Sequence, residues 1–412
     1  MFNIHLERKR GLGIRPGLER ISEFLDFIGN PQKKFKSVLI GGTNGKGSVT
    51  YYLSNLATKY TSLKIGRYTS PHLVSWNERY VIDEEIIDSA LIEDFASDIY
   101  DKVLEYEQTK TSEKLTVFEI YTLVAFALFA KENVDIAFLE VGMGGRKDAT
   151  NTVDSKDVLC SIIVTVSIDH TSYLGDTIEK IAYEKAGIIK ENNIVITSAE
   201  EPALKVIRDK AKEQNSKIIY TEASHSNHSS YKDKNIEVAL KAWDVISSQI
   251  KTNNNNTDKK LFLKSLQFPG RFQYIKEHDL LLDGAHNPQA AEELRKLLNL
   301  NFKNKKMVYI IGILDKDYKS FINNLIPEDS QCFVICTEPK SERATKKEVL
   351  AEYIKSIGSA ATTSISLKSA LEEALNISHD AIVITGSLYL VGEALELVQD
   401  EQRKKSCLLN QN

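Results

Sequence analysis

The alternation of short Val- and Ile-rich runs with helical patterns is the feature of this 412-residue sequence that most restricts its fold. Such runs, without strict period-two alternation, are typical of parallel strands whose two faces are both covered by helices. The sequence therefore predicts an α/β protein with a mostly parallel sheet. In the first part of the chain we expect strands at 36–42, 63–69, 135–142, 159–168 and 193–198, and helices at 47–59, 83–107, 117–132, 178–189 and 201–214.

A second alternating series begins after Gln267-Phe268-Pro269-Gly270-Arg271. One hydrophobic core usually stops growing at about 250–300 residues, and a Pro-Gly pair is typical of a turn between domains. We therefore expect two α/β domains, residues 1–269 and 270–412. The expected elements of the second are strands at 279–283, 307–312, 331–336 and 381–385, and helices at 288–299, 317–326, 345–356, 367–376 and 387–400.

Composition excludes several classes of protein. The 53 Lys and Arg against 57 Asp and Glu give a net charge of −4, which argues against an overall attraction to nucleic acid or anionic lipid. Four cysteines without a CxxC pair indicate neither a disulfide framework nor a zinc site. The N-terminus lacks an apolar signal segment, and the longest apolar run, 121–130, is about half of the ~20 residues that a membrane helix needs. We expect a cytoplasmic protein that binds neither nucleic acid nor membranes.

The segment Gly41 to Ser48, GGTNGKGS, lies between an expected strand and an expected helix. Glycines allow successive backbone N–H groups to face an anion, the helix N-terminus adds a favourable dipole, and Lys46 adds positive charge. The segment departs from the pattern GxxxxGK[ST], because Gly47 lies between Lys46 and Ser48. It predicts a variant phosphate-binding loop for ATP, although such a loop alone would equally suit a kinase or another NTPase.

Two polar residues follow expected strands: Glu140 after IAFL, and His170 after SIIVTVSID. Parallel sheets bind ligands at the carboxyl ends of their strands, so both would lie beside the phosphate loop if their strands are neighbours. With ATP phosphates they could hold Mg²⁺. Taken alone, each would also suit a structural role. Lys185 in a helical pattern would suit an exposed lysine, and Asp283 in LLLDGAHNP would suit a turn.

Several motifs occur together and in a fixed order: GGTNGKGSV, YTSPHLVSWNER, LTVFE, LEVGMGGRKDATN, DHTSYLGDTIEKIAYEKAGIIK, FPGRFQ, LDGAHNP and GSLYLVGE. In these motifs and their order, the sequence resembles the folylpolyglutamate synthase family of the Mur ligases over nearly its whole length. The resemblance implies an N-terminal P-loop ATPase domain of the Mur-ligase type and a C-terminal Rossmann-like domain. It also implies that the chain is an ATP-dependent ligase.

The resemblance further implies roles for individual residues. Lys46, His170 and Lys185 would be catalytic, and two Mg²⁺ sites would involve Ser70, Glu140, His170 and a carbamylated Lys185. ATP would contact Thr43, Asn44, Gly45, Lys46, Gly47 and Ser48, with Asn235 at the adenine and Arg271 and Asp283 from the second domain. The pteroate group would contact Thr116, Phe118, Asp148 and Ala149, and the incoming glutamate would lie near His286 and Ser387.

The implied reaction adds L-glutamate to dihydropteroate and then to reduced folates, through an acyl phosphate, in a monomeric enzyme. The alternatives are a folylpolyglutamate synthase without the first activity, and a Mur-type ligase acting on a nucleotide sugar, for which no additional N-terminal domain is evident. A third is a non-enzymatic ATP-binding regulator. That alternative predicts missing catalytic positions, whereas Lys46, Glu140, His170 and Lys185 are all present.

Overall fold

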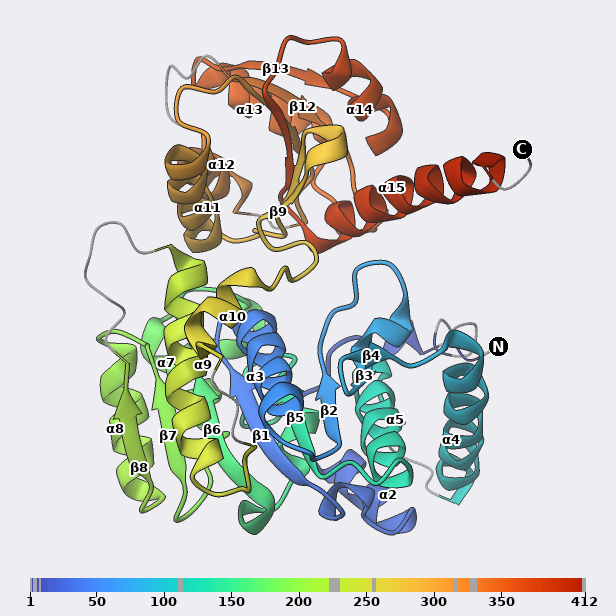
Figure 1. The fold of residues 1–412 in the computed structure, drawn as a ribbon, viewed down its shortest axis with the longest axis vertical. Coiled ribbons are helices and arrows are strands. Elements are labelled where there is room, and N and C mark those ends of the chain that lie inside the picture. Colours follow the sequence, from blue (N-terminus) through green and yellow to red (C-terminus); the bar gives the residue numbers. More distant parts are fainter. Residues whose placement is uncertain are drawn as a thin grey trace. The chain divides into compact units, whose positions relative to one another are not determined.

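The structure, a computed structural model, describes residues 2, 6, 9–109, 114–221, 230–253, 257–314, 317–326 and 332–409. The chain forms two compact units (Figure 1). The first comprises the chain up to Pro71 and Asn77–Leu266, and the second comprises His72–Trp76 and the chain from Gln267 onward. A short segment from the N-terminal half therefore belongs to the second unit. Within the described residues, no helix is both long enough and apolar enough to cross a bilayer.

The first unit is built on a sheet with the strand order β4-β3-β2-β5-β1-β6-β7-β8. The strands from β2 to β8 in this order are parallel, and β3 and β4 add an antiparallel edge. β1 lies at the centre, between β5 and β6. The strands are β1 Lys36–Gly41, β2 Ile65–Tyr68, β3 Tyr80–Ile82, β4 Glu85–Ile86, β5 Ile136–Glu140, β6 Val158–Ile163, β7 Ile194–Thr197 and β8 Lys217–Tyr220.

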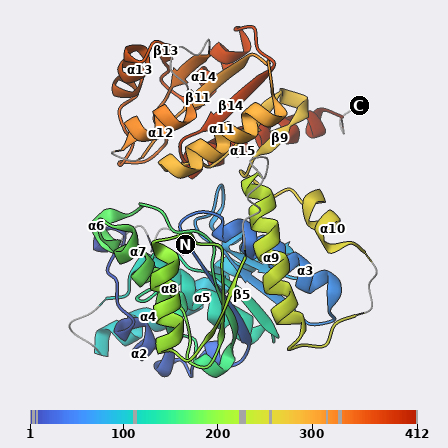
Figure 2. The same ribbon diagram turned by 90° about the vertical axis from the view of Figure 1, so that its left-hand side faces the viewer.

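Helices cover both faces of this sheet. Figure 2 shows α3 and α9 on one face and α5, α7 and α8 on the other. The core on the α3 face joins Val38 and Ile40 of β1 to Leu53 of α3 and Trp243 of α9. The helices are α2 Glu19–Phe27, α3 Lys46–Tyr60, α4 Ser89–Thr109, α5 Val117–Lys131, α6 Thr171–Leu174, α7 Ile178–Ala186, α8 Ala203–Glu213, α9 Tyr231–Ser247 and α10 Lys259–Ser265.

The second unit contains a sheet with the order β13-β12-β11-β14-β10-β9, in which only the edge strand β9 is antiparallel to its neighbour. One face packs on α11, α12 and α13, and the other on α14 and α15. Its strands are β9 Gln273–Ile275, β10 Leu280–Leu282, β11 Met307–Ile311, β12 Phe333–Cys336, β13 Ala360–Thr363 and β14 Ala381–Thr385. Its helices are α11 Pro288–Asn301, α12 Tyr318–Leu325, α13 Lys347–Ser356, α14 Leu367–Leu375 and α15 Leu388–Leu409.

The inserted segment His72–Trp76 packs into the core of the second unit. Leu73 and Val74 lie against the cluster that contains Val391 of α15. The fit leaves no room for a side chain at Gly392, where a Cβ would lie 2.0 Å from the Leu73 carbonyl oxygen. The chain is therefore anchored in the second unit directly after the Ser70-Pro71 pair.

The predicted α/β class with mostly parallel sheets is confirmed. The prediction of one helix over 83–107 is wrong at its start. Asp83 and Glu84 have φ of +51° and +68° and connect the antiparallel strands β3 and β4, so α4 begins only at Ser89. Positive φ at both central residues is the geometry of a two-residue hairpin turn, which the helical reading of this segment overlooked.

Candidate active site

The phosphate-binding loop connects β1 to α3 at the centre of the first sheet. Gly42 and Gly45 have φ of +141° and +87°, which a residue with a side chain rarely adopts, and α3 begins at Lys46. A Cβ on Gly45 would lie 2.4 Å from the Asn235 side-chain oxygen and 2.9 Å from Val164. The loop is thus packed closely between α9 and the residue that follows β6, and Asn235 of α9 lies directly against it.

Two lysines converge on one carbonyl group of this loop. Lys46 Nζ donates to Gly42 O and to Thr43 O, both at 3.1 Å, and Lys185 Nζ donates to Gly42 O at 2.8 Å. In the described part of the chain, neither ammonium forms a salt bridge with a carboxylate. Positive charge therefore gathers at the N-terminus of α3, where the backbone also favours an anion.

Lys185 is 3% exposed, so the interpretation of an exposed helical lysine is wrong. Burial, together with a smaller contribution from the charge of Lys46, lowers the pKa of Lys185 to about 7, although Asp169 and Asp148 partly oppose the shift. A substantial fraction of this amine is therefore neutral near pH 7. A neutral amine is the form that reacts as a nucleophile.

Glu140 is the last residue of β5, is buried, and lies in register with Ile40 of β1. Its Oε2 accepts a hydrogen bond from the backbone N–H of Ser70 at 3.0 Å. Ser70 follows β2, the neighbour of β5 on the other side. The carboxylate and the segment carrying the Ser70 hydroxyl are thereby held at the carboxyl edge of the sheet, next to the strand that leads into the phosphate loop.

His170 follows β6, which is not a neighbour of β5: both strands flank β1, one on each side. The assumed adjacency of the two strands is therefore wrong, although both end at the same edge of the sheet. His170 directly precedes α6, has a φ of +49°, and its ring is exposed. Its backbone N–H donates to Asp169 Oδ1 at 2.8 Å, and its Nε2 lies 3.8 Å from Asp169 Oδ2.

The residues expected to bind pteroate surround the loop that follows β5. The Phe118 ring covers Gly142, where a Cβ would lie 2.4 Å from the ring. Asp148 accepts hydrogen bonds from the Met143 N–H at 2.9 Å and from the Thr150 N–H and hydroxyl at 3.0 and 2.7 Å. Burial raises the pKa of Asp148, and these hydrogen bonds oppose the shift.

Thr116 and Ala149 are both buried at the edges of this region. Thr116 begins α5 through a capping box with Glu119: each side chain accepts a hydrogen bond from the other's backbone N–H, at 3.3 and 2.7 Å. Glu119 also pairs with Arg20 at 3.1 Å. The hydroxyl of Thr116 therefore has a structural task, irrespective of any ligand.

In the second unit, the expected site residues lie where β10 and β14 end side by side. Asp283 is buried and accepts hydrogen bonds from the Phe272 N–H at 2.8 Å and the Ala285 N–H at 2.9 Å. Ser387 is buried and accepts from the Leu390 N–H at 3.1 Å. His286 Nδ1 lies 3.0 Å from Gly284 O. Arg271 reaches the same carbonyl, with Nη1 at 3.5 Å.

Comparison with known proteins assigns the chain to a family. Residues 40–274 match the model of the Mur ligase middle domain, and residues 271–397 match that of the dihydrofolate synthetase C-terminal domain. A probable dihydrofolate synthetase of Schizosaccharomyces pombe is 32% identical over 92% of this chain and 97% of its own. The chain belongs to the folylpolyglutamate synthase family of the Mur ligases. It is therefore an ATP-dependent ligase.

Two solved structures resemble this Mur ligase along almost its entire length. Escherichia coli FolC in complex with DHPP and ADP has a TM-score of 0.85 at 26% identity and covers 97% of this chain and 98% of its own. The bifunctional folylpolyglutamate synthase/dihydrofolate synthase of Yersinia pestis, complexed with AMPPNP and Mn ion, has a TM-score of 0.81 at 25% identity, covering 97% of both chains. The two-unit architecture is thus shared with these ligases.

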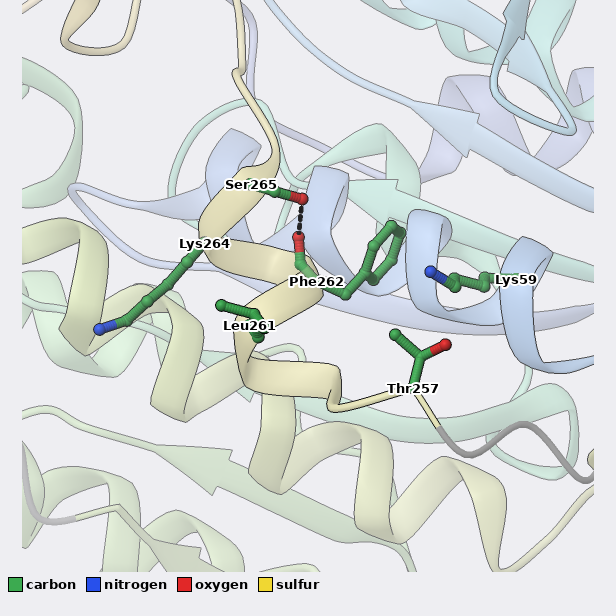
Figure 3. A pocket seen from close by; sticks show the side chains of 6 residues that line it. All are labelled: Lys59, Thr257, Leu261, Phe262, Lys264 and Ser265. Carbon is green, nitrogen blue, oxygen red and sulfur yellow. Dashed lines mark hydrogen bonds between the residues drawn. The ribbon is translucent and has the colours of Figure 1, made fainter.

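A separate pocket of about 460 Å³ in this Mur ligase opens between α10 and the end of α3 (Figure 3). The Lys59 ammonium lies 3.8 Å from the centroid of the Phe262 ring, and Ser265 Oγ donates to Phe262 O at 2.7 Å. Lys59 follows Lys46 by almost four helical turns, about 20 Å along α3. The pocket contains none of the expected site residues: its lining is Lys59, Thr257, Leu261, Phe262, Lys264 and Ser265.

Inspection of the sequence overlooked one residue at the phosphate loop of this ligase. Thr165 lies in the run that was interpreted as a strand over 159–168, whereas β6 ends at Ile163 and Thr165 instead contacts Asn44. Nothing in its local sequence distinguishes it from an ordinary strand threonine. The contact joins residues 121 positions apart and becomes visible only in the fold.

Proposed function

We propose that this Mur ligase joins L-glutamate to dihydropteroate and to reduced folates, with ATP as the source of energy. The observation that carries the proposal is the convergence of Lys46 and Lys185 on the Gly42 carbonyl at the N-terminus of α3. The Lys46 ammonium and the Lys185 amine, which is partly protonated near pH 7, give this carbonyl a local positive charge that a triphosphate would neutralise.

The reaction has two steps. A carboxylate oxygen of the pteroate or folate substrate attacks the γ-phosphorus of ATP, the bond to the β-phosphate oxygen breaks, and ADP leaves. The amine of L-glutamate then attacks the carbonyl carbon of the acyl phosphate, inorganic phosphate leaves, and a proton is released. Lys46 would offset the charge that develops on the transferred phosphoryl group, and the loop backbone would orient it.

Magnesium would be held by the Glu140 carboxylate, the Ser70 hydroxyl and the His170 imidazole. Within the described residues no three His, Cys, Asp or Glu side chains form a metal site by themselves, so phosphate oxygens would complete the shell. The Glu140–Ser70 hydrogen bond fits this donor set, because Mg²⁺ prefers one or two carboxylates together with phosphate oxygens. When bound, the ion neutralises phosphate charge. A carbamylated Lys185 would hold a second ion.

The remaining assignments follow the same proposal. Residues 1–269 would provide the ATP and pteroate sites, with Thr43, Asn44, Gly45, Gly47, Ser48 and Asn235 at the nucleotide, and Thr116, Phe118, Asp148 and Ala149 at the pteroate group. Residues 270–412 would bind glutamate near His286 and Ser387 and contact ATP through Arg271 and Asp283. We further propose a monomeric, cytoplasmic enzyme, which size-exclusion chromatography with light scattering and cell fractionation would test.

A second candidate is a dihydrofolate synthetase without polyglutamate activity. It is favoured by the match of residues 271–397 to the dihydrofolate synthetase C-terminal domain and by the S. pombe relative. A third candidate is a folylpolyglutamate synthase that adds glutamate to reduced folates but not to dihydropteroate. Steady-state ADP release with Mg·ATP and L-glutamate separates all three. The proposal expects ADP with either dihydropteroate or tetrahydrofolate, whereas ADP with one acceptor alone supports a monofunctional enzyme.

A further inference from the structure

The phosphate loop is tied to the segment that follows β6 by hydrogen bonds from both sides. The Thr43 N–H donates to Thr165 O at 2.7 Å, which extends the pairing of β1 and β6 into the loop. The Thr165 hydroxyl accepts from the Asn44 N–H at 3.0 Å and lies 3.1 Å from Asn44 O, to which it donates. One hydroxyl group thus engages both polar groups of the Asn44 backbone.

The arrangement is reciprocal. The Thr43 hydroxyl donates to Ser167 O at 3.2 Å and accepts from the Ser167 N–H at 3.0 Å. Each threonine therefore holds the backbone of the opposite segment, and we name this pair, Thr43 and Thr165, the threonine clamp. The clamp is a property of the tertiary fold, because its members are more than 120 positions apart in the sequence.

Close packing indicates that the clamp sets the shape of the loop. A Cβ on Gly42 would lie 3.1 Å from Thr165 N and 3.2 Å from Thr165 O, so the two backbones are in direct contact. A glycine-rich loop has many accessible conformations, and a ligand binds it more weakly when only a fraction of the molecules has the competent one. The segment held by the clamp also continues directly to His170.

We propose that Thr165 is a positioning residue for nucleotide binding. Its hydroxyl fixes the Asn44 backbone and thereby keeps the phosphate loop in the conformation that receives the triphosphate. Valine has nearly the same shape as threonine but can neither donate nor accept a hydrogen bond, so Thr165→Val removes the hydroxyl while it retains the bulk of the side chain. This inference rests on the proposed function, in which ATP occupies this loop.

The test compares binding of Mg·AMPPNP to Thr165→Val, Thr165→Ser and the wild type by calorimetry. We expect about tenfold weaker binding for Thr165→Val, from the loss of two hydrogen bonds, and nearly wild-type binding for Thr165→Ser. The KM for ATP should rise by a similar factor, while kcat at saturating ATP changes by less than about twofold, because only the loop population is altered.

Thr197→Val is the matched control. Thr197 lies on β7, and its hydroxyl donates to Ile163 O at 2.7 Å and accepts from the Ala199 N–H at 3.1 Å. Its removal also breaks two buried hydrogen bonds, so it should lower the unfolding temperature without weakening Mg·AMPPNP binding. Equal loss of affinity in both variants, or wild-type affinity in Thr165→Val, would overturn the inference.

A measurement on the wild type keeps the inference testable if Thr165→Val does not fold. Hydrogen exchange of the Thr43 and Asn44 amides in the nucleotide-free protein should be as slow as that of the β1 amides, since both are bonded to Thr165. Exchange at the rate of an open loop would contradict the clamp. If the wild type fails to bind Mg·AMPPNP although these amides are protected, the proposed function is wrong and the clamp is only structural.

Discussion

The carboxyl edges of the two sheets use their polar residues differently. At the edge of the first sheet, Lys46 and Lys185 share the Gly42 carbonyl. At the edge of the second, Asp283 and Ser387 accept hydrogen bonds from nearby backbone N–H groups. The phosphate loop at the first edge therefore carries positive charge that a ligand can neutralise, whereas Asp283 and Ser387 at the second edge stabilise the loops in which they lie. Substitution of Lys46 should therefore mainly affect turnover, whereas substitution of Asp283 or Ser387 should lower stability in addition to any effect on ligand binding.

The largest effect is expected for Lys46→Met. Loss of this charge should lower kcat/KM for ATP about 10³-fold, the order found when a group that stabilises developing negative charge is removed. Stability should be unchanged or slightly increased, because the substitution also removes the repulsion on Lys185. Steady-state ADP release and thermal unfolding measure the two effects. Near-wild-type turnover would remove Lys46 from the mechanism.

Lys185→Met should alter the pH dependence of stability. The pKa of Lys185 is lowered to about 7 in the folded protein, from an ordinary value of 10.5. Below pH 7 the amine is charged in both states, and the cost of burying that charge is fully present. Between about pH 7 and 10 the folded state releases the proton while the unfolded state retains it, so stability rises. From pH 7 to 10, the free energy of unfolding of the wild type should therefore rise by a few kcal/mol relative to that of Lys185→Met.

Urea unfolding at several pH values checks this prediction, with Lys190→Met as the control. Burial lowers the pKa of Lys190 to about 8, so the rise in stability that depends on Lys190 should begin about one pH unit higher than the rise that depends on Lys185. A constant difference in unfolding free energy between the wild type and Lys185→Met from pH 7 to 10 would show that Lys185 is not desolvated as described.

Asp283→Asn should destabilise the second unit by about 2 kcal/mol. Each carboxylate oxygen of Asp283 accepts from a backbone N–H in the wild type, and in the variant the amide NH₂ would face one of these donors. Chemical denaturation measures the loss. Asp279→Asn is the control, since Asp279 accepts from the Tyr274 hydroxyl at an exposed site. If Asp283→Asn retains full stability, the contrast between the two edges fails. A loss of ATP affinity in this variant would support the proposed contact of Asp283 with the nucleotide.

The smallest effect is expected for Ser387→Ala, which removes the acceptor for the Leu390 N–H and should cost about 1 kcal/mol. Ser366→Ala is a matched control, because Ser366 caps α14 by accepting from the Ser369 N–H at 3.1 Å. Equal losses in unfolding free energy are expected. If the KM for glutamate rises in Ser387→Ala but not in Ser366→Ala, Ser387 contacts the ligand in addition to capping its helix.

Long buried runs made the central elements predictable from the sequence. β1, β5 and α5 are mostly apolar, α3 has apolar residues at helical spacing, and the glycines between β1 and α3 indicate the turn of the phosphate loop. Short edge strands gave no such signal: β4 has only two residues, both exposed, and β13 reads AATT. The strand order could not be predicted from the sequence either, because the position of β1 between β5 and β6 depends on packing across the sheet.

The chemistry of the site was only partly predictable for the same reason. Lys46 belongs to a local motif, so its position at the loop could be inferred. Lys185 looks like any helical lysine, because its burial results from a contact with Gly42, 143 positions earlier in the chain. Thr165 was overlooked on similar grounds. Residues whose role depends on a distant partner need the fold or a family resemblance to be recognised.

The central claim is that ATP activates the substrate carboxylate at the phosphate loop, and an isotope measurement tests it most directly. Dihydropteroate labelled with ¹⁸O in its carboxyl group is converted with Mg·ATP and L-glutamate, and the inorganic phosphate is analysed by mass spectrometry. An acyl phosphate transfers one carboxyl oxygen to phosphate, so each turnover should yield phosphate with one ¹⁸O atom. Product formation with unlabelled phosphate would contradict the account.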